Sequence, residues 1–311
     1  KEEQSLNKHF SIVFNEGGRE ILINEEHLEK TDLPIDLKKA TAIRPYQERA
    51  LSKMFNGGRA KSGVIVLPCG AGKTLVGITA TCTIRKSTII FCNSTYLVHQ
   101  WRAQFFSWIT TNTNTDIDNY IYLFTAKNKP SISPDKPSIL ITTYSIFTSG
   151  KAEQTQILID QLTSREWGLM IMDEVQEMVA EQTREVVKRI KAHAKLGLTA
   201  TLVREDDNIL DLNYLIGPRL YEANWIDLAN QGYIARVKCY EVWCKMTGPF
   251  YKQYLLAPNK GRLYSALNPN KFNAVERLIK YHEKLGHKIL VFADILYALH
   301  QYYEYLKQSD S

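Results

Sequence analysis

Short apolar runs alternate with longer segments of mixed polarity along most of the chain. The runs suit strands that are buried on both faces, and they occupy residues 64–67, 87–91, 120–124, 138–141 and 168–172. Residues 75–84 and 93–109, which lie between successive runs, are long enough for helices. Strands that alternate with helices in this order predict a parallel sheet covered by helices on both faces, and therefore an α/β fold. Ligands of such folds bind at the carboxyl ends of the strands.

The predicted helix at residues 93–109 carries three large aromatic side chains at helical spacing, namely Trp101, Phe105 and Trp108. Such residues fall on one side of the helix, where they form either part of a hydrophobic core or a platform for stacked bases. We favour the core, because an apolar stripe that packs against a sheet is the more common use of this pattern.

The first apolar run leads directly into the sequence PCGAGKT, residues 68–74. Gly70 and Gly72 allow the backbone around Ala71 to curl, so that its N–H groups point at a polyphosphate near the start of the next helix. This order of strand, glycine loop and helix is typical of phosphate-binding loops. One departure is visible, since Leu67 stands where the general pattern has Gly or Ala.

Two residues after the glycines carry the chemistry of such a loop. Lys73 is expected to reach the β- and γ-phosphates, and the Thr74 hydroxyl is expected to ligate Mg²⁺. The alternative is an ordinary turn that happens to contain Gly-Lys-Thr, but the complete motif after a strand favours the phosphate loop. The sequence therefore predicts a site for a nucleoside triphosphate.

A second motif, Arg44-Pro45-Tyr46-Gln47, precedes this loop and predicts a helix that the proline begins. The Gln47 amide offers a donor and an acceptor, which matches the N6 and N7 atoms of adenine. A capped surface helix is the competing interpretation. The position of the motif before a phosphate loop favours the adenine contact.

Two further strand ends carry polar side chains. After the fifth apolar run, Asp173 is expected to hold Mg²⁺, generally through water, and Glu174 to orient the attacking water. Residues 195–201 (KLGLTAT) predict another buried strand that ends at Thr199 and Thr201. These hydroxyls can bond both the phosphate side and a neighbouring domain, although isolated threonines would be ordinary turn residues.

Composition narrows the class of protein. Among 311 residues, 44% are hydrophobic and 23% charged, which is an ordinary globular balance, and the net charge of +6 fits a polyanionic partner without demonstrating one. The five cysteines show no CxxC spacing, so we expect reduced thiols and neither a zinc site nor a disulfide framework. No apolar run approaches the roughly 18 residues of a membrane span, so no membrane partner is expected.

These motifs, in this order and at these distances, resemble the XPB/Ssl2 family of superfamily 2 DNA helicases, the DNA translocases of the transcription and repair factor TFIIH. The resemblance covers residues from about Ile35 to Leu306. It is carried by RPYQ (44–47), LPCGAGKT (67–74), REWGLMIMDEV (165–175), LTATLVREDD (198–207), YEANW (221–225), NPNKF (268–272) and KILVFAD (288–294). The sequences LTATLVREDD and YEANW are not general helicase motifs.

The resemblance implies a RecA-like ATPase domain, ATP and Mg²⁺ as cofactors, and a set of site residues. The catalytic residues that it implies are Lys73, Asp173, Glu174 and Gln176. The residues that bind the cofactor are Arg44, Gln47, Gly70, Ala71, Gly72, Lys73 and Thr74, and Mg²⁺ is held at Thr74 and Asp173. The residues that couple the site to DNA are Thr199, Thr201, Arg204, Glu205 and Asp206.

Two of the implied DNA regions have competing interpretations. Arg204-Glu205-Asp206 matches a family motif implicated in opening DNA, but acids that begin a helix also favour its dipole without any role in DNA binding. Residues from about 239 to 271 correspond to the family's thumb-like region. Their lysines, arginine and tyrosines either track a phosphate backbone or form a solvated basic face.

The chain departs from the family pattern at two places. Gln176 stands where the family has His; it keeps hydrogen-bonding capacity but cannot become cationic, which puts the coupling of hydrolysis to DNA movement in doubt. Residues 288–293 and 295–306 predict one strand and one helix, which resemble only the opening of a second RecA-like lobe. An arginine-bearing motif that completes the ATP site is absent from the sequence, so we expect this chain alone to bind nucleotide weakly and hydrolyse it poorly.

The expected organisation has four parts. Residues 1–40 are an N-terminal extension or the end of an upstream domain, 41–225 the first RecA-like domain, 226–272 a thumb-like linking region, and 273–311 the start of an incomplete second RecA-like domain.

The expected function is that of a nuclear, ATP-dependent translocase or helicase that opens duplex DNA in transcription initiation and nucleotide excision repair, together with other TFIIH-type subunits. A translocase of restriction or chromatin-remodelling type is a related alternative, and the Arg204-Glu205-Asp206 and YEANW motifs argue against it. A catalytically weak, ATP-binding scaffold subunit of a transcription or repair complex is the alternative from another class.

Overall fold

The chain forms two compact units, one up to residue 236 and one from residue 237 onward. The computed structural model describes residues 32–111, 116–133, 136–149, 152–177, 181–201 and 213–309. Arg204, Glu205 and Asp206 lie outside the described residues.

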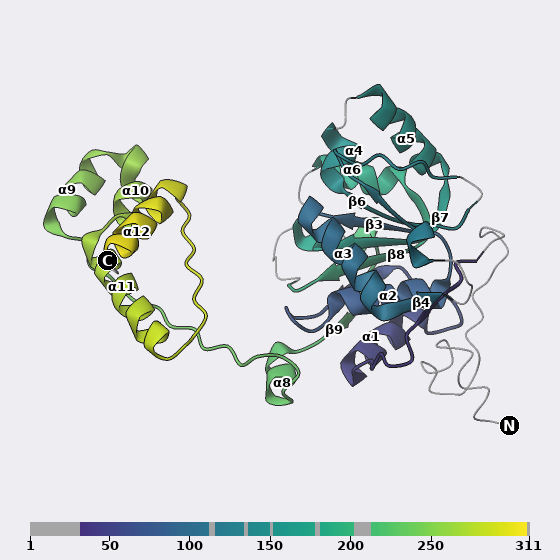
Figure 1. Cartoon of the computed structure of the whole chain (residues 1–311), viewed down its shortest axis with the longest axis horizontal. Coiled ribbons are helices and arrows are strands. Elements are labelled where there is room, and N and C mark those ends of the chain that lie inside the picture. The colour runs from purple at the N-terminus through teal and green to yellow at the C-terminus, as the bar shows by residue number, and fades with distance from the viewer. Residues whose placement is uncertain are drawn as a thin grey trace. The chain divides into compact units, whose positions relative to one another are not determined.

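Strands and helices of the first unit alternate along most of the chain, although β5 is followed directly by β6 and α4 directly by α5 (Figure 1). The strands are β1 (Ile35–Leu37), β2 (Gly63–Val66), β3 (Thr88–Cys92), β4 (Ile109–Thr111), β5 (Ile121–Phe124), β6 (Ile139–Thr143), β7 (Glu166–Asp173), β8 (Lys191–Thr199) and β9 (Arg219–Glu222). The helices are α1 (Pro45–Phe55), α2 (Lys73–Ile84), α3 (Thr95–Trp108), α4 (Tyr144–Ser149), α5 (Glu153–Ser164), α6 (Glu181–Arg189) and α8 (Trp225–Asn230).

Seven of these strands form one sheet in the order β5-β6-β3-β7-β8-β2-β9. Every neighbouring pair in it is parallel. The expectation of an α/β, RecA-like parallel sheet is therefore confirmed, and each apolar run of the first unit that predicted a strand forms one. The edge strand β9 was not predicted, because its sequence RLYE has no apolar run, and it is only partly buried.

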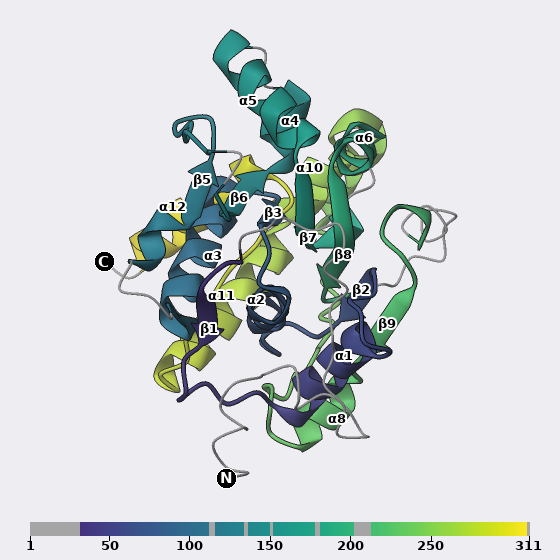
Figure 2. The same ribbon diagram turned by 90° about the vertical axis from the view of Figure 1, so that its right-hand side faces the viewer.

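The sheet is covered on both faces, so its strands are apolar on both sides. Alternate residues of β2 point to opposite layers: Ile65 packs with α1, α2 and α3, whereas Val64 and Val66 pack with α4, α5 and α6. Figure 2 shows these two groups of helices on opposite sides of the strands. Burial on both faces explains why the strands read as continuous runs of Val, Ile and Leu.

The aromatic stripe of α3 faces the first of these layers, as expected. Trp101 is 1% exposed and Phe105 is fully buried, and Trp108 packs against them from the edge of the core. The same layer receives Leu33 and Ile35, both fully buried, and β1 pairs antiparallel with β4. The described end of the N-terminal segment therefore lies against the first unit.

The described part of the second unit is helical. It contains α9 (Gly248–Leu256), α10 (Gly261–Ala266), α11 (Pro269–Lys284) and α12 (Leu296–Ser309). Phe272 of α11 stacks on Tyr302 of α12 with ring centroids 3.7 Å apart, and the Tyr302 hydroxyl donates to Ala266 O at 3.1 Å. The predicted four-part division of the chain stays a prediction, although α11 runs across its boundary at residues 272 and 273.

One predicted element of this unit is wrong. Residues 288–293 were expected to form a strand, but they form none, and Leu290 and Phe292 are more than 80% exposed. A strand needs a neighbour that exchanges backbone hydrogen bonds, and the described residues of this unit provide helices only. The helix expected after it is confirmed as α12.

None of the helices in the described part of the chain is both long enough and apolar enough to span a bilayer.

The close approach of β9 to β2 predicts the effect of a substitution at Gly63. A Cβ added at Gly63 would lie 2.4 Å from Pro218 O and 2.6 Å from Leu220 Cγ, so β9 would have to move. We expect Gly63→Ala to lower the free energy of unfolding of the first unit by about 1–3 kcal/mol. Gly248→Ala is the control, because its added Cβ meets nothing within 4 Å. Equal thermal unfolding of both variants would contradict this account.

Candidate active site

The sheet register brings three motifs to one edge. In the order β7-β8-β2, Asp173 is the register partner of Leu198, and Thr199 is the partner of Val66. The backbone N–H of Leu67 continues the ladder by donating to Thr199 O at 2.9 Å. The phosphate-loop sequence, the two acids and the Thr-Ala-Thr turn therefore leave the sheet at neighbouring positions.

The glycine loop has the curled backbone that the sequence predicts. Gly70 and Gly72 have φ values of 78° and 81°, which side chains rarely adopt. Gly72 is the N-cap of α2, and a Cβ added there would lie 2.4 Å from Gln47 Nε2. Lys73 and Thr74 are the first two residues of α2, at the end of the helix where backbone N–H groups favour an anion.

Helix α1 supports this loop from inside the protein. The Tyr46 hydroxyl and Gln47 Nε2 both donate to Ala71 O, at 2.8 and 2.9 Å. Gln47 Oε1 accepts from the Arg44 backbone N–H at 2.9 Å, and Gln47 is only 2% exposed. Both ends of the amide are therefore engaged within the protein. Contact with adenine stays a prediction, and it would require some of these bonds to be exchanged.

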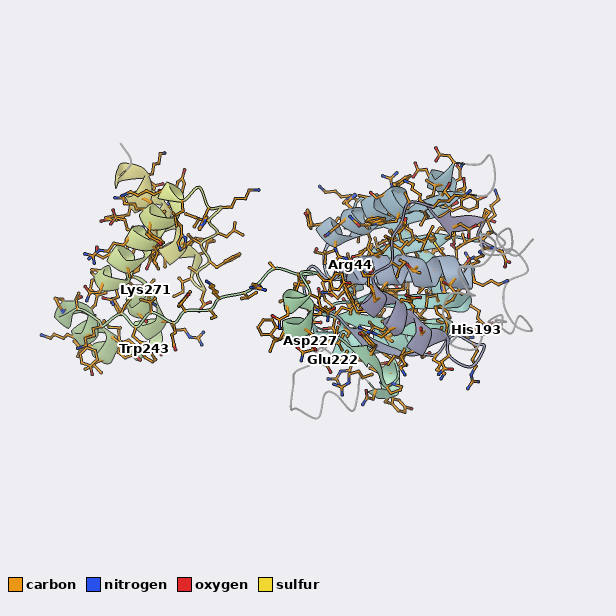
Figure 3. The ribbon with its side chains drawn as sticks, turned by 90° about the horizontal axis from the view of Figure 1, so that it is seen from below. Arg44, His193, Glu222, Asp227, Trp243 and Lys271 are labelled. Atoms are coloured by element: carbon orange, nitrogen blue, oxygen red, sulfur yellow. The ribbon has the colours of Figure 1, made fainter. Side chains whose placement is uncertain are left out.

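The Arg44 side chain lies on the surface beside the same helix (Figure 3). Its guanidinium donates to the Tyr46 hydroxyl at 3.1 Å and to Tyr233 O at 3.0 Å, and it lies 5.5 Å from the centre of the Tyr233 ring. The Tyr46 and Tyr233 rings meet edge to face at 5.3 Å. Arg44 therefore ties residue 233 to the helix that supports the phosphate loop.

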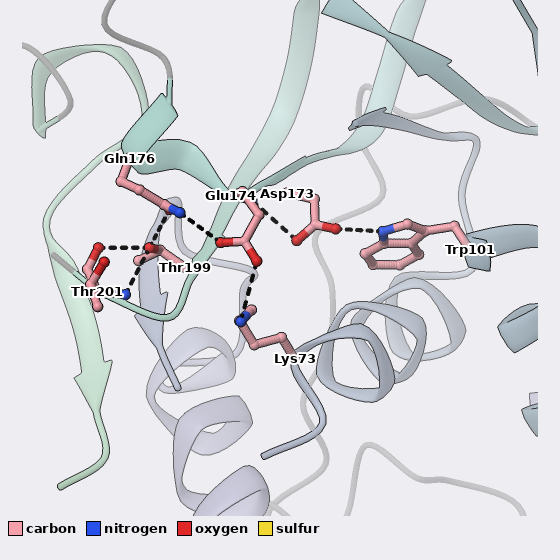
Figure 4. Close-up of polar contacts among 7 residues, drawn as sticks. All are labelled: Lys73, Trp101, Asp173, Glu174, Gln176, Thr199 and Thr201. Carbon is pink, nitrogen blue, oxygen red and sulfur yellow. Dashed lines mark hydrogen bonds and ion pairs between the residues drawn. The ribbon is translucent and has the colours of Figure 1, made fainter. Parts of the chain in front are cut away.

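The two acids at the end of β7 have different surroundings (Figure 4). Asp173 is 6% exposed, whereas Glu174 is half-buried and forms an ion pair with Lys73, with Nζ and Oε1 3.4 Å apart. Glu174 has a φ of 52°, a left-handed conformation that is costly for a residue with a side chain. The turn away from the strand at this residue places one acid in the core and the other beside the lysine.

Both oxygens of the Asp173 carboxylate accept a hydrogen bond. Trp101 Nε1 donates to Oδ2 at 2.8 Å, and the Glu174 backbone N–H donates to Oδ1 at 3.1 Å. Burial raises the pKa of Asp173 above its usual value, and the bond from Trp101 opposes that rise in pKa. The neighbouring Glu174 charge also raises this pKa, and the Lys73 charge lowers it.

Gln176 connects Glu174 to the end of β8. Its Nε2 donates to Glu174 Oε2 at 2.8 Å, and its Oε1 faces the Thr199 hydroxyl within hydrogen-bonding distance. The Thr199 oxygen accepts from the Thr201 backbone N–H at 3.1 Å, and it lies 2.7 Å from Thr201 O. A glutamine can bridge these groups because its amide donates at one end and accepts at the other.

The residues present fit a nucleotide-bound Mg²⁺. This ion takes oxygen ligands and binds through one or two carboxylates together with substrate phosphates and water. Asp173 and Thr74 supply a carboxylate and a hydroxyl, and the Thr74 side chain makes no hydrogen bond to any other residue in the described part of the chain. Asp173 is buried and Lys73 lies nearby. This environment suits a carboxylate that holds a cation beside a phosphate group.

The structure adds three residues that the sequence motifs did not assign to the site: Trp101, Tyr46 and Tyr233. Trp101 was assigned to the core, and it is in the core, but its N–H also reaches Asp173. A buried tryptophan must find an acceptor for that N–H, which is the signal that the sequence offered.

Part of the predicted thumb-like region is also brought together in space. In the second unit, Tyr254, Arg262 and Lys271 line one hollow of about 840 Å³. Trp243 and Lys271 both belong to this unit (Figure 3), and Trp243 is 86% exposed. The Arg262 and Lys271 cations, together with the Tyr254 ring in the same hollow, suit a phosphate backbone with exposed bases or sugars.

Comparisons with known proteins place the chain in a family. Residues 40–204, more than half of the chain, match the family described as "Type III restriction enzyme, res subunit". Residues 228–309 match the family described as "ERCC3/RAD25/XPB C-terminal helicase". The XPB subunit of the general transcription and DNA repair factor IIH from Schizosaccharomyces pombe is 55% identical over 274 residues, 87% of this chain. The chain belongs to the XPB family of helicases.

Other members of the XPB family show similar agreement. The XPB/SSL2 helicase/translocase subunit of Saccharomyces cerevisiae is 54% identical over 274 residues, again 87% of this chain. The chain spans about a third of the length of these curated relatives, 33% and 32%. Among solved structures, the Hef helicase domain of Pyrococcus furiosus matches 73% of this chain and 47% of its own, with 20% identity and a TM-score of 0.45.

The raised pKa of Asp173 predicts how its substitution depends on pH. Because the folded state disfavours the charged carboxylate, ionised Asp173 lowers stability above its folded-state pKa, and this penalty disappears as the pH falls below the unfolded-state value. We expect the melting temperature of Asp173→Asn, relative to the unmodified protein, to rise as the pH is raised from mildly acidic to neutral. Thermal unfolding at several pH values checks this. A difference that is constant, or that grows towards acid, would contradict it.

Proposed function

We propose that this chain is the ATPase part of a DNA translocase or helicase that couples ATP hydrolysis to the opening of duplex DNA. The observation that carries the proposal is the ion pair between Lys73 and Glu174, at the sheet edge where Asp173 and Thr199 also end their strands. A lysine on a glycine loop and a carboxylate pair at this place suit phosphoryl transfer.

The residues would act in a defined order. A triphosphate in the loop would draw Lys73 away from Glu174, because the phosphate charge is larger than that of one carboxylate. Glu174 would then be free to orient and polarise the attacking water. Mg²⁺, held at Thr74 and Asp173, would neutralise charge on the phosphate oxygens.

The Gln176 bridge suggests how the site reports its state. Glu174, Gln176 and Thr199 form one hydrogen-bonded chain, so a movement of Glu174 on nucleotide binding would be felt at the end of β8. The residues that follow β8 include the predicted DNA-coupling motif Arg204-Glu205-Asp206. The Gln176 amide cannot acquire a charge, so we expect its part in this coupling to be insensitive to pH around neutrality.

The family supports a proposal for the substrate and the partners. Curated relatives are named as helicase/translocase subunits of a general transcription and DNA repair factor. We propose duplex DNA as the polymer, other subunits of a TFIIH-type complex as partners, and the nucleus as the location. The net charge of +6 and the hollow lined by Arg262 and Lys271 support a polyanionic partner.

A catalytically weak ATP-binding scaffold is the second candidate. The observation in its favour is Gln176, which replaces the family's histidine and already occupies Glu174 in a hydrogen bond. The two candidates share nucleotide binding and differ in turnover.

The first experiment measures ATP hydrolysis with and without duplex DNA. It compares the 311 residues with a longer polypeptide that continues through the second lobe, and Lys73→Ala is the matched variant. We expect DNA-stimulated turnover in the longer protein, abolished by Lys73→Ala. In the shorter chain we expect turnover about 10³–10⁵-fold lower if an arginine is needed across the cleft. Bound ATP without turnover in the longer protein would favour the scaffold.

A second substitution separates the two candidates directly. Glu174→Gln removes the carboxylate that orients water but keeps a side chain of the same size beside Lys73. In an ATPase it is expected to trap bound ATP, with hydrolysis reduced about 10²–10⁴-fold. Filter retention of labelled ATP after single-turnover mixing measures this. Identical ATP lifetimes in the variant and the unmodified protein would exclude the enzymatic role of Glu174.

A further inference from the structure

The indole N–H of Trp101 reaches a carboxylate that the proposed function assigns to the metal. Trp101 Nε1 lies 2.8 Å from Asp173 Oδ2, and the Glu174 backbone N–H lies 3.1 Å from Asp173 Oδ1 (Figure 4). Each oxygen therefore has one fixed donor, which leaves its remaining lone pairs in a defined direction. We propose that Trp101 is a positioning residue that orients Asp173 towards the nucleotide-bound divalent cation.

The indole is itself held by the helix that follows the phosphate loop. A Cβ added at Gly77 of α2 would lie 2.7 Å from Trp101 Cη2 and 3.3 Å from Cζ3. Helix α2 begins with Lys73 and Thr74, so the ring packs against the same helix that presents these two residues. One rigid side chain thus contacts both the helix of the phosphate loop and the acid at the end of β7. It can set the spacing between the two halves of a metal site.

Comparison with other tryptophans shows that this arrangement is not simply the burial of an aromatic ring. Trp108, on the same helix, donates to Gln104 Oε1 at 2.7 Å, and Trp167 donates to Leu162 O at 3.0 Å. Each of these two bonds lies within a short stretch of chain. The bond from Trp101 joins α3 to β7, 72 residues apart, and its acceptor is ionisable. Bonds to a charged acceptor are about twice as strong as neutral ones.

The chemistry of the contact fits an outer-shell role. Partners that hydrogen-bond a ligating side chain orient it towards the metal, and their loss typically costs about 10–100-fold in metal affinity or activity. The Trp101 N–H contributes only direction, because an indole does not ionise at neutral pH and its N–H is a donor that cannot ligate a cation. The metal dependence of nucleotide binding is therefore the property it should control.

The proposal rests on the proposed Mg²⁺–ATP site, and its test separates the two. The dissociation constant of the non-hydrolysable analogue AMPPNP is measured by calorimetry in Mg²⁺ and in EDTA, for the unmodified protein, Trp101→Phe and Trp108→Phe. Trp101→Phe keeps an aromatic ring and removes the donor. We expect this variant to reduce the ratio of the dissociation constant in EDTA to that in Mg²⁺ by about 10-fold, with the constant in EDTA unchanged. Trp108→Phe, the matched control, should leave both constants unchanged.

The outcomes discriminate between failures. If Trp101→Phe weakens binding equally in Mg²⁺ and in EDTA, the residue is structural and the inference is overturned. If its ratio equals that of the unmodified protein, the inference is likewise overturned while the metal site stands. If the unmodified protein binds the analogue equally well with and without Mg²⁺, the metal site fails, and the inference fails with it.

A measurement on the unmodified protein covers the case in which Trp101→Phe does not fold. The indole ¹⁵N–H resonance of Trp101 is assigned by elimination, using phenylalanine variants of the other tryptophans. Addition of Mg²⁺ to the AMPPNP complex should shift this resonance more than that of Trp108, because only Trp101 donates to Asp173. No shift at Trp101 would overturn the proposal.

Discussion

A buried carboxylate at the end of a central strand is the constraint on which the site depends. Asp173 lies at the C-terminal end of β7, between β3 and β8 in the sheet, and it is 6% exposed. A charge in that place costs free energy unless fixed donors satisfy it. Trp101 and the Glu174 backbone N–H provide the donors, and Lys73 provides a nearby charge. The same contacts hold the Asp173 carboxylate in one orientation.

The left-handed turn at Glu174 separates the two adjacent acids. In a continuing strand, neighbouring side chains point to opposite faces of the sheet. Here the chain leaves the strand at a φ of 52°, and Glu174 reaches Lys73 on one side and Gln176 on the other. The strained residue is also the proposed catalytic one, in agreement with the tendency of such conformations to occur at functional sites.

The phosphate loop is supported by side chains of helix α1, which packs beside it, rather than by residues of the loop itself. Tyr46 and Gln47 converge on one carbonyl oxygen, that of Ala71, and Gly72 has no room for a side chain beside Gln47. Arg44 extends this arrangement to Tyr233 at the end of the first unit. Arg44, α1 and Tyr233 thus form one connected group of contacts that supports the loop. The indole of Trp101 supports Asp173 in a similar way.

The sequence by itself determined the parallel sheet and the residues at its edge. Runs such as Val64–Leu67 can only be buried on both faces, and the glycines before Lys73 need a curled backbone, so both features could be predicted locally. It did not determine β9 or the Trp101–Asp173 bond. Only the tertiary structure decides whether RLYE meets β2, and which acceptor a buried indole finds 72 residues away. The strand predicted at 288–293 failed for the same reason, because a strand exists only where a neighbour pairs with it.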